Sequence, residues 1–314
     1  MNKPLKVLVT GGAGYLGSIL VGRLLAEGHR VTVLDNLLYS QYSLFQYSAH
    51  PAFDFAFGDV RDEATMKPLV GRHDAIIHLA AIVGAKTCDR DPILTRTVNH
   101  ESVLLLNRLR GRGQMVVFPC TNSGYGTRSG EIHCTEETPL EPISLYGVTK
   151  VEAEKALLDQ GSAVCLRLAT VFGMSPRMRL DLLVNDFTYK AVTQRYLVLY
   201  EKHFKRNYIG IEDVARCFCF ALENFEAMQG RPYNVGLDDA NLSKEELALK
   251  IKEYVPELYI HEAEVGSDPD RRNYIVSNER IRAAGFRTTQ SLDDGIGQLL
   301  KGYRMIRRTE FTNA

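Results

Sequence analysis

The sequence has 314 residues, in which 38 Lys and Arg residues balance 38 Asp and Glu residues, so the formal net charge at pH 7 is zero. This balance argues against a general nucleic-acid or membrane-surface binder and leaves a small molecule as the expected partner. There is no run of about 18 apolar residues to span a membrane and no signal-peptide pattern at the start, so we expect a cytoplasmic protein.

Short apolar runs alternate with helical patterns through the first half of the sequence. Strands are predicted at 5–10, 30–35, 53–57, 74–79, 114–119 and 162–168. Helices are predicted near 14–27, 62–70, 92–109 and 144–159. This alternation is typical of an α/β fold of the Rossmann type, in which a doubly wound parallel sheet is covered on both faces and binds ligands at the carboxyl ends of its strands.

The pattern becomes less regular after Gly173. It includes a strand-like run at 196–199, a helix near 212–227 and a capping box at 243–246 that opens another helix. We therefore expect a sheet domain over 1–173 and a smaller, mixed α/β substrate lobe over 174–314, with some later segments returning to the sheet. The six cysteines are scattered, and we expect free thiols and no metal site.

A glycine-rich turn, Thr10-Gly11-Gly12-Ala13-Gly14-Tyr15-Leu16-Gly17, follows the first predicted strand and opens the first predicted helix. Gly11 permits a tight turn, Gly14 lets the main chain approach a diphosphate, and Gly17 lets the helix pack closely on the strand. The second predicted strand ends in Asp35, at the spacing expected for an acid that binds the adenosine ribose. These features predict a dinucleotide site, and the acid favours NAD over NADP.

Tyr146 and Lys150 are four residues apart and therefore share one face of a predicted helix. An ammonium beside a phenol favours the phenolate, so Lys150 would bring Tyr146, whose ordinary pKa is about 10, towards the operating pH as a general base. Downstream of a dinucleotide-binding turn, this pair indicates catalysis rather than a solvated helix surface. Thr121, at a strand end, is the candidate to hydrogen-bond the reacting hydroxyl, whereas Asn122 and Ser123 could equally serve only to make a turn.

In their order and spacing, these residues resemble the extended short-chain dehydrogenase/reductases that act on nucleotide sugars. The resemblance covers nearly the whole chain and rests on the glycine-rich turn, Asp35-Asn36, 58–62, 78–81, Thr121 with Tyr125-Gly126, Tyr146 with Lys150, and 206–209 leading into 213–215. It implies that Thr121, Tyr146 and Lys150 are catalytic. It also implies that NAD is bound by Gly11, Gly14, Tyr15, Leu16, Gly17, Asp35, Asn36, Asp59, Val60, Leu79, Ala80, Ala81, Asn99, Tyr146 and Lys150.

Different parts of the cofactor are assigned to these residues by the resemblance. Asp35 and Asn36 would hold the adenosine ribose, Asp59 and the Val60 backbone the adenine, and Ala80 with its neighbours the diphosphate or nicotinamide side. Lys150 would bind the nicotinamide ribose. From the residues alone, Asp59 could equally cap the next helix, and His78, just before Leu79, is expected to be a core histidine.

The resemblance further implies a nucleotide-sugar substrate whose diphosphate is bound by Arg206 and Arg272, because a planar guanidinium meets phosphate oxygens bidentately. Asn122-Ser123 stands where 4,6-dehydratases of the family carry an Asp-Glu pair, so elimination of water is not expected. The candidate substrate-binding residues are Asn122, Ser123, Arg179, Asn185, Arg206 and Arg272.

Segments 120–126, 168–181 and 268–270 resemble a subgroup that includes the bacterial GDP-heptose 4-dehydrogenases of surface-polysaccharide synthesis. We therefore expect an NAD-dependent oxidoreductase that acts at C4 of a nucleotide-diphosphate sugar and gives a 4-keto sugar. Two alternatives stay open: a 4-epimerase that reduces the ketone again, and a non-catalytic NAD-sensing regulator. In the family, the helices corresponding to 92–109 and 144–159 pair across a dimer, which implies a homodimer.

Overall fold

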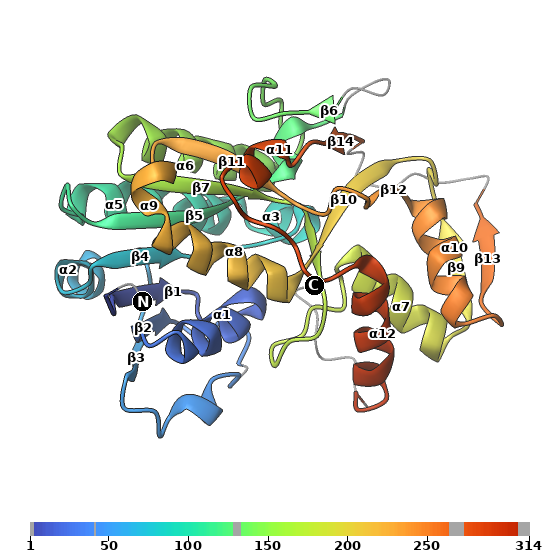
Figure 1. Ribbon diagram of the computed structural model, residues 1–314, viewed down its shortest axis with the longest axis horizontal. Helices are drawn as coiled ribbons and strands as arrows, with labels where there is room; N and C mark the ends of the chain where they lie inside the picture. The colour runs from blue at the N-terminus through green and yellow to red at the C-terminus, as the bar shows by residue number, and fades with distance from the viewer. Residues whose placement is uncertain (1–2, 41, 128–132, 264–272, 307–314) are drawn as a thin grey trace.

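The structure, a computed structural model, describes residues 3–40, 42–127, 133–263 and 273–306. Seven parallel strands form the central sheet in the order β11-β7-β5-β4-β1-β2-β3 (Figure 1). They are β1 (Lys6–Thr10), β2 (Arg30–Asp35), β3 (Phe53–Phe57), β4 (Ala75–His78), β5 (Met115–Thr121), β7 (Ala163–Leu168) and β11 (Arg231–Val235). The first six begin and end within two residues of the predicted strands. The order of strands reverses between β1 and β4, so their carboxyl ends flank a crevice where a ligand can bind.

Helices cover both faces of this sheet, because alternate residues of each buried strand point to opposite faces. Val7 and Val9 of β1 belong to a core shared with α1 and α8, whereas Leu8 packs in a second core with α2, α5 and α6. Figure 1 shows α1 and α8 side by side on one face. The helices of the sheet domain are α1 (Tyr15–Ala26), α2 (Glu63–Gly71), α3 (Ala85–Arg90), α4 (Pro92–Arg96), α5 (Ser102–Leu109), α6 (Leu145–Gln160), α8 (Ile211–Glu223), α9 (Phe225–Met228) and α11 (Glu279–Ala283).

The predicted single helix over 92–109 is interrupted. A π-helical turn (Thr97–Glu101) separates α4 from α5 and carries the buried Asn99 inward. The Asn99 side chain accepts a hydrogen bond from Ile82 N at 2.8 Å and donates one to Ile82 O at 2.9 Å. The helix widens here because Asn99 has to reach the backbone of Ile82. Hydrophobic periodicity in the sequence gives no sign of this π-helical turn.

A second group of elements forms its own core beyond the sheet. It consists of β8 (Thr170–Phe172), α7 (Leu183–Thr193), β9 (Tyr196–Leu199), β10 (Lys205–Gly210), β12 (Asn241–Ser243), α10 (Lys244–Tyr254), β13 (Tyr259–Glu262) and α12 (Leu292–Tyr303). The predicted strand at 196–199 is confirmed, and so is the capping box, in which the Ser243 and Glu246 side chains bond each other's backbone N–H. The short strands β6 (His133–Cys134) and β14 (Ile275–Val276) pair with each other.

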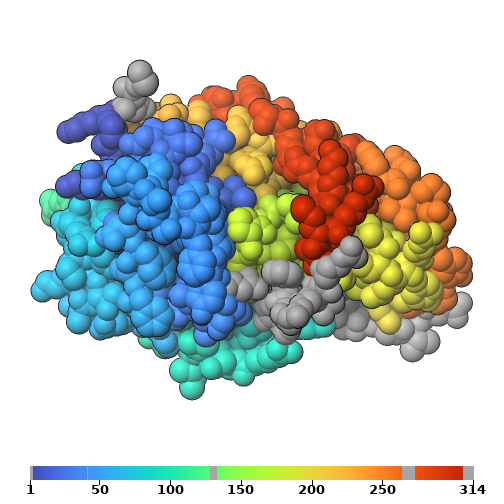
Figure 2. Space-filling model, turned by 90° about the horizontal axis from the view of Figure 1, so that it is seen from below, coloured from blue at the N-terminus to red at the C-terminus, as the bar shows by residue number. Residues whose placement is uncertain are grey.

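The segment over 173–185 is hydrogen-bonded to the first turn of α1. Tyr15 Oη donates to Gly173 O at 2.7 Å, and Ser175 Oγ donates to Tyr15 O at 2.8 Å. On its other side, Tyr303 Oη of α12 donates to Asn185 O at 2.8 Å. Figure 2 shows this yellow-green segment between the blue N-terminal residues and red α12. The second group of elements is thereby held against the end of the sheet where β1 leads into α1.

Candidate active site

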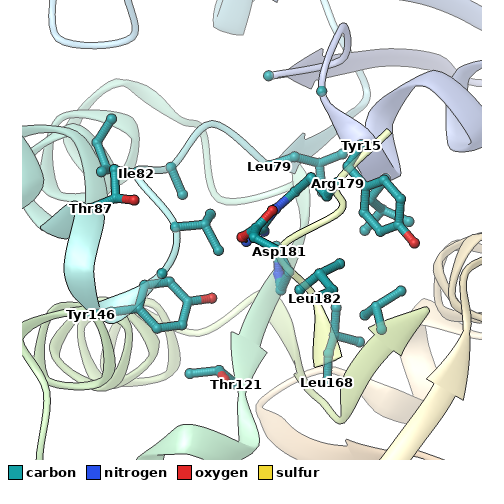
Figure 3. Close-up of a pocket in the computed structure, with 18 of the residues that line it drawn as sticks. Tyr15, Leu79, Ile82, Thr87, Thr121, Tyr146, Leu168, Arg179, Asp181 and Leu182 are labelled. Carbon is teal, nitrogen blue, oxygen red and sulfur yellow. The ribbon is translucent and has the colours of Figure 1, made fainter. Parts of the chain in front are cut away.

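A cleft of about 970 Å3 runs between the carboxyl ends of the strands and the second group of elements (Figure 3). The predicted cofactor residues that line it are Gly11, Gly14, Tyr15, Leu16, Gly17, Asp35, Asn36, Asp59, Val60, Leu79, Ala80 and Ala81. The predicted catalytic and substrate residues that line it are Thr121, Ser123, Tyr146, Lys150, Arg179 and Arg206. The fold therefore brings residues from 11 to 206 to one cavity.

The glycine-rich turn approaches its neighbours too closely for side chains. Gly11 has a φ of +68°, and a Cβ there would lie 2.6 Å from Ala80 N. A Cβ on Gly17 would lie 2.6 Å from Gly12 Cα, which confirms the close packing expected at this glycine. Gly14 precedes α1 without a side-chain cap, so the helix N-terminus faces the cleft with backbone N–H groups, which suits the diphosphate of NAD.

Two carboxylates lie at the adenosine end of the cleft. Asp35 accepts hydrogen bonds from Ala13 N at 2.9 Å and Leu37 N at 2.8 Å, while burial raises the pKa of its carboxyl group. Asp59 pairs with Arg61 at 2.7 Å, and this hydrogen bond holds the pKa of Asp59 below its usual value. Asp62, not Asp59, caps α2, so the alternative role considered for Asp59 is wrong.

The candidate reaction centre lies on α6 and at the end of β5. Ser144 caps α6 by accepting a hydrogen bond from Gly147 N, which sets where the first turn, with Tyr146, begins. Lys150, one turn later, is buried with its Nζ 3.8 Å from the centroid of the Phe118 ring. Burial lowers the pKa of Lys150 to about 8. Thr121 Oγ1, at the end of β5, lies 2.9 Å from Ser123 Oγ.

An ion pair that sequence reasoning missed lies opposite Tyr146. Arg179 Nε donates to Asp181 Oδ1 at 3.1 Å, and a second hydrogen bond makes the pair bidentate. Figure 3 shows the Tyr146 hydroxyl and the Asp181 carboxylate facing the same space. Burial alone would raise the pKa of Asp181, but the Arg179 hydrogen bond and charge outweigh it and lower that pKa. The only signal for Asp181 in the sequence is that it and Arg179 are charged residues within the otherwise apolar run 178–184.

Three predicted site residues lie behind the cleft wall rather than on it. Asn185 is fully buried, and its side chain bonds Gly173 N, Tyr15 Oη and Arg179 O, so it shapes the wall instead of offering donors to a substrate. Asn99 supports Ile82 in the same way. Asn122 is buried next to Thr121, and neither Oδ1 nor Nδ2 of its side chain is hydrogen-bonded to any described residue. Arg272 lies outside the described residues.

His78 has the core role expected of it. It lies between Thr10 Oγ1 and Ser102 Oγ, each 3.0 Å from a ring nitrogen, and it is fully buried. Burial, reinforced by the Lys150 charge, lowers the pKa of His78 to about 3. The ring is therefore neutral and joins the end of β4 to α5.

Comparison with known proteins identifies the family. The model of the NAD dependent epimerase/dehydratase family matches residues 7–236. The chain belongs to this family. Its cofactor is NAD, as expected from the glycine-rich turn and Asp35. Among the described residues, no helix is long and apolar enough to cross a membrane, and no group of three His, Cys, Asp or Glu residues could hold a metal ion.

Relatives within this family cover most of the chain. The low-salt glycan biosynthesis protein Agl12 of Haloferax volcanii is 30% identical over 92% of this chain and 96% of its own length. The UDP-glucose 4-epimerase of Corynebacterium glutamicum is 30% identical over 75% of this chain and 76% of its own. Among solved structures, dTDP-glucose 4,6-dehydratase of Streptomyces venezuelae with NAD is 26% identical, with a TM-score of 0.84 over 96% of this chain and 98% of that one. UDP-glucose 4-epimerase of Thermus thermophilus with NAD is 25% identical, with a TM-score of 0.81 over 95% of this chain and 99% of that one.

Other cleft residues carry no signal in the local sequence. Tyr39 reaches the cleft from the segment after β2, Lys190 from α7 and Lys244 from the start of α10. Lys244 Nζ donates to Tyr200 O at 2.8 Å. These residues belong to ordinary turn and helix patterns, so their place in this family's cleft follows only from the packing of the two groups of elements.

Proposed function

We propose that this chain oxidises the C4 hydroxyl of a nucleotide-diphosphate sugar to a ketone with NAD, as a 4-dehydrogenase of the GDP-heptose type. The observation that carries the proposal is that Tyr146, Lys150 and Thr121 line the same cleft as Gly11 and Asp35. When bound in that cleft, NAD accepts the hydride. The resemblance of 120–126 and 168–181 to GDP-heptose 4-dehydrogenases supports the choice of sugar nucleotide.

The residues around the reacting hydroxyl have separate roles in this proposal. Tyr146, as phenolate, takes the proton of the C4 hydroxyl, and the Lys150 ammonium favours that phenolate. Lys150 also binds the nicotinamide ribose. Thr121 orients the hydroxyl by a hydrogen bond, because its own hydroxyl hydrogen can rotate away from Ser123. Their contribution is to hold the proton acceptor and the reacting carbon in contact.

Cations from the second group of elements and from the segment before α7 suit the diphosphate of the substrate. Arg206, Lys244 and Arg179 are all buried, and all three line the cleft. A guanidinium fork binds two phosphate oxygens at once, which favours Arg206 as the principal contact. Arg272 stays a predicted second contact.

Replacing Tyr146 with Phe tests the chemistry. The Tyr146→Phe variant should bind NAD as the wild type does but lose turnover by about a hundredfold to ten-thousandfold, since only the proton acceptor is removed. Tyr196→Phe, on the exposed face of β9, is the matched control and should keep full activity. Full activity in Tyr146→Phe would contradict the proposed base.

A 4-epimerase is the second candidate, favoured by the UDP-glucose 4-epimerase relative at 30% identity. The two activities differ in the fate of the ketone. Release of a 4-keto sugar with one reduced cofactor per product supports the dehydrogenase, whereas interconversion of C4 epimers without net reduced cofactor supports the epimerase. Mass analysis of products with GDP-linked and UDP-linked sugars, together with nicotinamide absorbance, distinguishes them. Nucleotide binding without any redox change would instead support the NAD-sensing regulator.

We also propose that the protein forms a homodimer through the helices over 92–109, which are α4 and α5, and through α6. Leu104 on α5 is 41% exposed and Ile93 on α4 is 78% exposed, which leaves apolar side chains on this surface. Val103, Leu106 and Leu157 are buried in the monomer and belong to its core instead. Analytical ultracentrifugation should find a dimer for the wild type and a monomer for Leu104→Glu, and a wild-type monomer would contradict the proposal.

A further inference from the structure

Arg177, in the segment between β8 and α7, brings a positive charge to the part of the cleft next to the glycine-rich turn. Ser175 Oγ, which bonds Tyr15 O in the first turn of α1, also accepts a hydrogen bond from Arg177 N at 3.2 Å. Ser18 Oγ lies 2.9 Å from the same Ser175 oxygen. Arg177 is therefore anchored, through two short links, to the N-terminal turn of α1, which is the part of the Rossmann domain that receives the diphosphate.

The Arg177 guanidinium is buried at the cleft with its hydrogen-bonding capacity only partly used, so an anion would stabilise it there. Arg177 is 2% exposed and lines the cleft, and its guanidinium lies 4.4 Å from the centroid of the Tyr39 ring. Nη1 donates to Met178 O at 3.0 Å, but Nη2 is buried and has no hydrogen-bond partner among the residues that the structure describes. A buried donor left unmatched is unfavourable, more so on a charged group.

The charges around Arg177 also indicate that this residue lacks an anionic partner. Burial and the adjacent Arg179 guanidinium both lower the pKa of Arg177. Arg179 has Asp181 as its partner, whereas no carboxylate of the described residues forms an ion pair with Arg177. Asp35 acts on Arg177 through its charge alone, without a hydrogen bond between the two residues. The free protein thus retains an excess positive charge beside its diphosphate-binding turn.

We propose that Arg177 is a ligand of the cofactor diphosphate, reached from the second group of elements across the first turn of α1 and held in place by the Tyr39 ring. The diphosphate of NAD carries two negative charges and can accept hydrogen bonds from a guanidinium fork. Backbone N–H groups of the glycine-rich turn would hold one side of that diphosphate and Arg177 the other. NAD would then be bound by residues of both groups of elements, not by the Rossmann sheet domain alone.

The test is calorimetric binding to Arg177→Gln after removal of co-purified nucleotide, with NAD, ADP-ribose and adenosine as probes. Loss of a charge-assisted hydrogen bond should weaken NAD and ADP-ribose by about tenfold to a hundredfold and leave adenosine, which has no phosphate, unchanged. The ligand-free variant should melt at the same temperature as the wild type or higher, because a repelled, unpartnered charge has been removed. Arg72→Gln, at an exposed arginine that is not part of the cleft lining, is the matched control and should change none of these values.

Three outcomes would overturn the proposal. Unchanged affinity for NAD and ADP-ribose removes Arg177 from the diphosphate site. A lower melting temperature without ligand, with adenosine weakened as much as NAD, means that Arg177 only supports the structure. Weakened binding of GDP or UDP with normal binding of ADP-ribose assigns it to the substrate. Since none of these measurements requires turnover, they stay informative even if Tyr146 proves not to be the base.

Discussion

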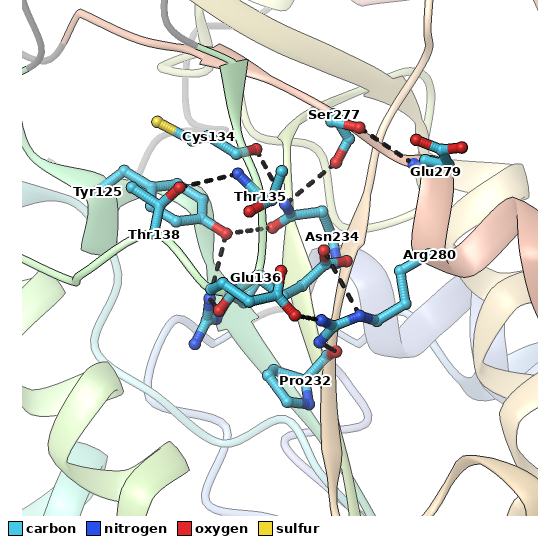
Figure 4. Close-up of polar contacts among 12 residues, drawn as sticks. Tyr125, Cys134, Thr135, Glu136, Thr138, Pro232, Asn234, Ser277, Glu279 and Arg280 are labelled. Carbon is cyan, nitrogen blue, oxygen red and sulfur yellow. Dashed lines mark hydrogen bonds and ion pairs between the residues drawn. The ribbon is translucent and has the colours of Figure 1, made fainter.

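Arg167 on β7 and Glu154 on α6 form a buried ion pair, with Arg167 Nη2 2.6 Å from Glu154 Oε1. Arg167 also donates to Tyr125 Oη. Tyr125 Oη in turn donates to Asn234 Oδ1 on β11 (Figure 4). Glu154 lies one helical turn after Lys150. The helix that carries Tyr146 and Lys150 is thus tied to the sheet by a polar network behind the cleft.

Replacing Glu154 with Gln should destabilise the protein. The substitution leaves the Arg167 guanidinium buried without a counter-charge, which typically costs about 3–5 kcal/mol. Glu152→Gln on the same helix removes a partly exposed pair with Arg96 and should cost less than about 1 kcal/mol. Urea unfolding of the two variants gives the comparison, and equal losses would mean that the buried pair contributes no more than a surface one.

Gly11→Ala should abolish NAD binding as well as destabilise the fold. A methyl group there meets Ala80 N at 2.6 Å, in addition to the unfavourable φ of +68°. Gly28→Ala separates the two effects, because Gly28 has a φ of +87° and no atom of the described part of the chain lies within 4 Å of the added Cβ. The control should lose only about 1–2 kcal/mol from backbone strain and bind NAD normally. Normal NAD binding by Gly11→Ala would show that the turn can move.

The neutral, buried His78 should make stability fall with acidification. Its pKa is about 3 in the folded protein and 6.5 when exposed, so between these pH values the unfolded chain binds the proton first. Stability contributed by neutral His78 is therefore complete above pH 6.5 and is lost as the pH falls towards 3, at up to roughly 1.4 kcal/mol per pH unit. In His78→Gln this slope should decrease, whereas His50→Gln, at an exposed histidine, should keep it. Denaturant titrations across this range measure both, and the same slope in His78→Gln and the wild type would contradict the assignment.

Turnover should decline as the pH rises through about 8, where Lys150 loses its proton. The neutral amine no longer favours the Tyr146 phenolate, so the alkaline limb of the kcat profile should follow Lys150. Lys150→Arg keeps the positive charge through this range, and its residual activity should lack that limb even if the maximal rate is lower. An unchanged alkaline limb in Lys150→Arg would assign it to another group.

Much of the sheet domain could be predicted from sequence because its signals are local. Buried parallel strands are short apolar runs. In the second group of elements, the capping box of α10 is equally local, because it needs only Ser243 and Glu246 at the right spacing. The turn at Gly11 and Gly14 requires glycine wherever it occurs, since a side chain would collide with the neighbouring backbone. Tyr146 and Lys150 could be paired in the same way, because four residues on a helix are one turn.

Only the tertiary structure decided which polar residues face the cleft. Asn185 and Arg177 lie in one segment with similar surroundings in the sequence, yet Asn185 is fully bonded behind the wall and Arg177 is left with an unmatched donor at the cleft. The joining of β11 to β7 and the placing of Asp181 and Tyr146 on one cleft likewise depend on the packing of residues far apart in the chain. Sequence patterns report the conformation of a residue and its immediate neighbours, whereas the partner of a side chain is chosen by the packing of the whole fold.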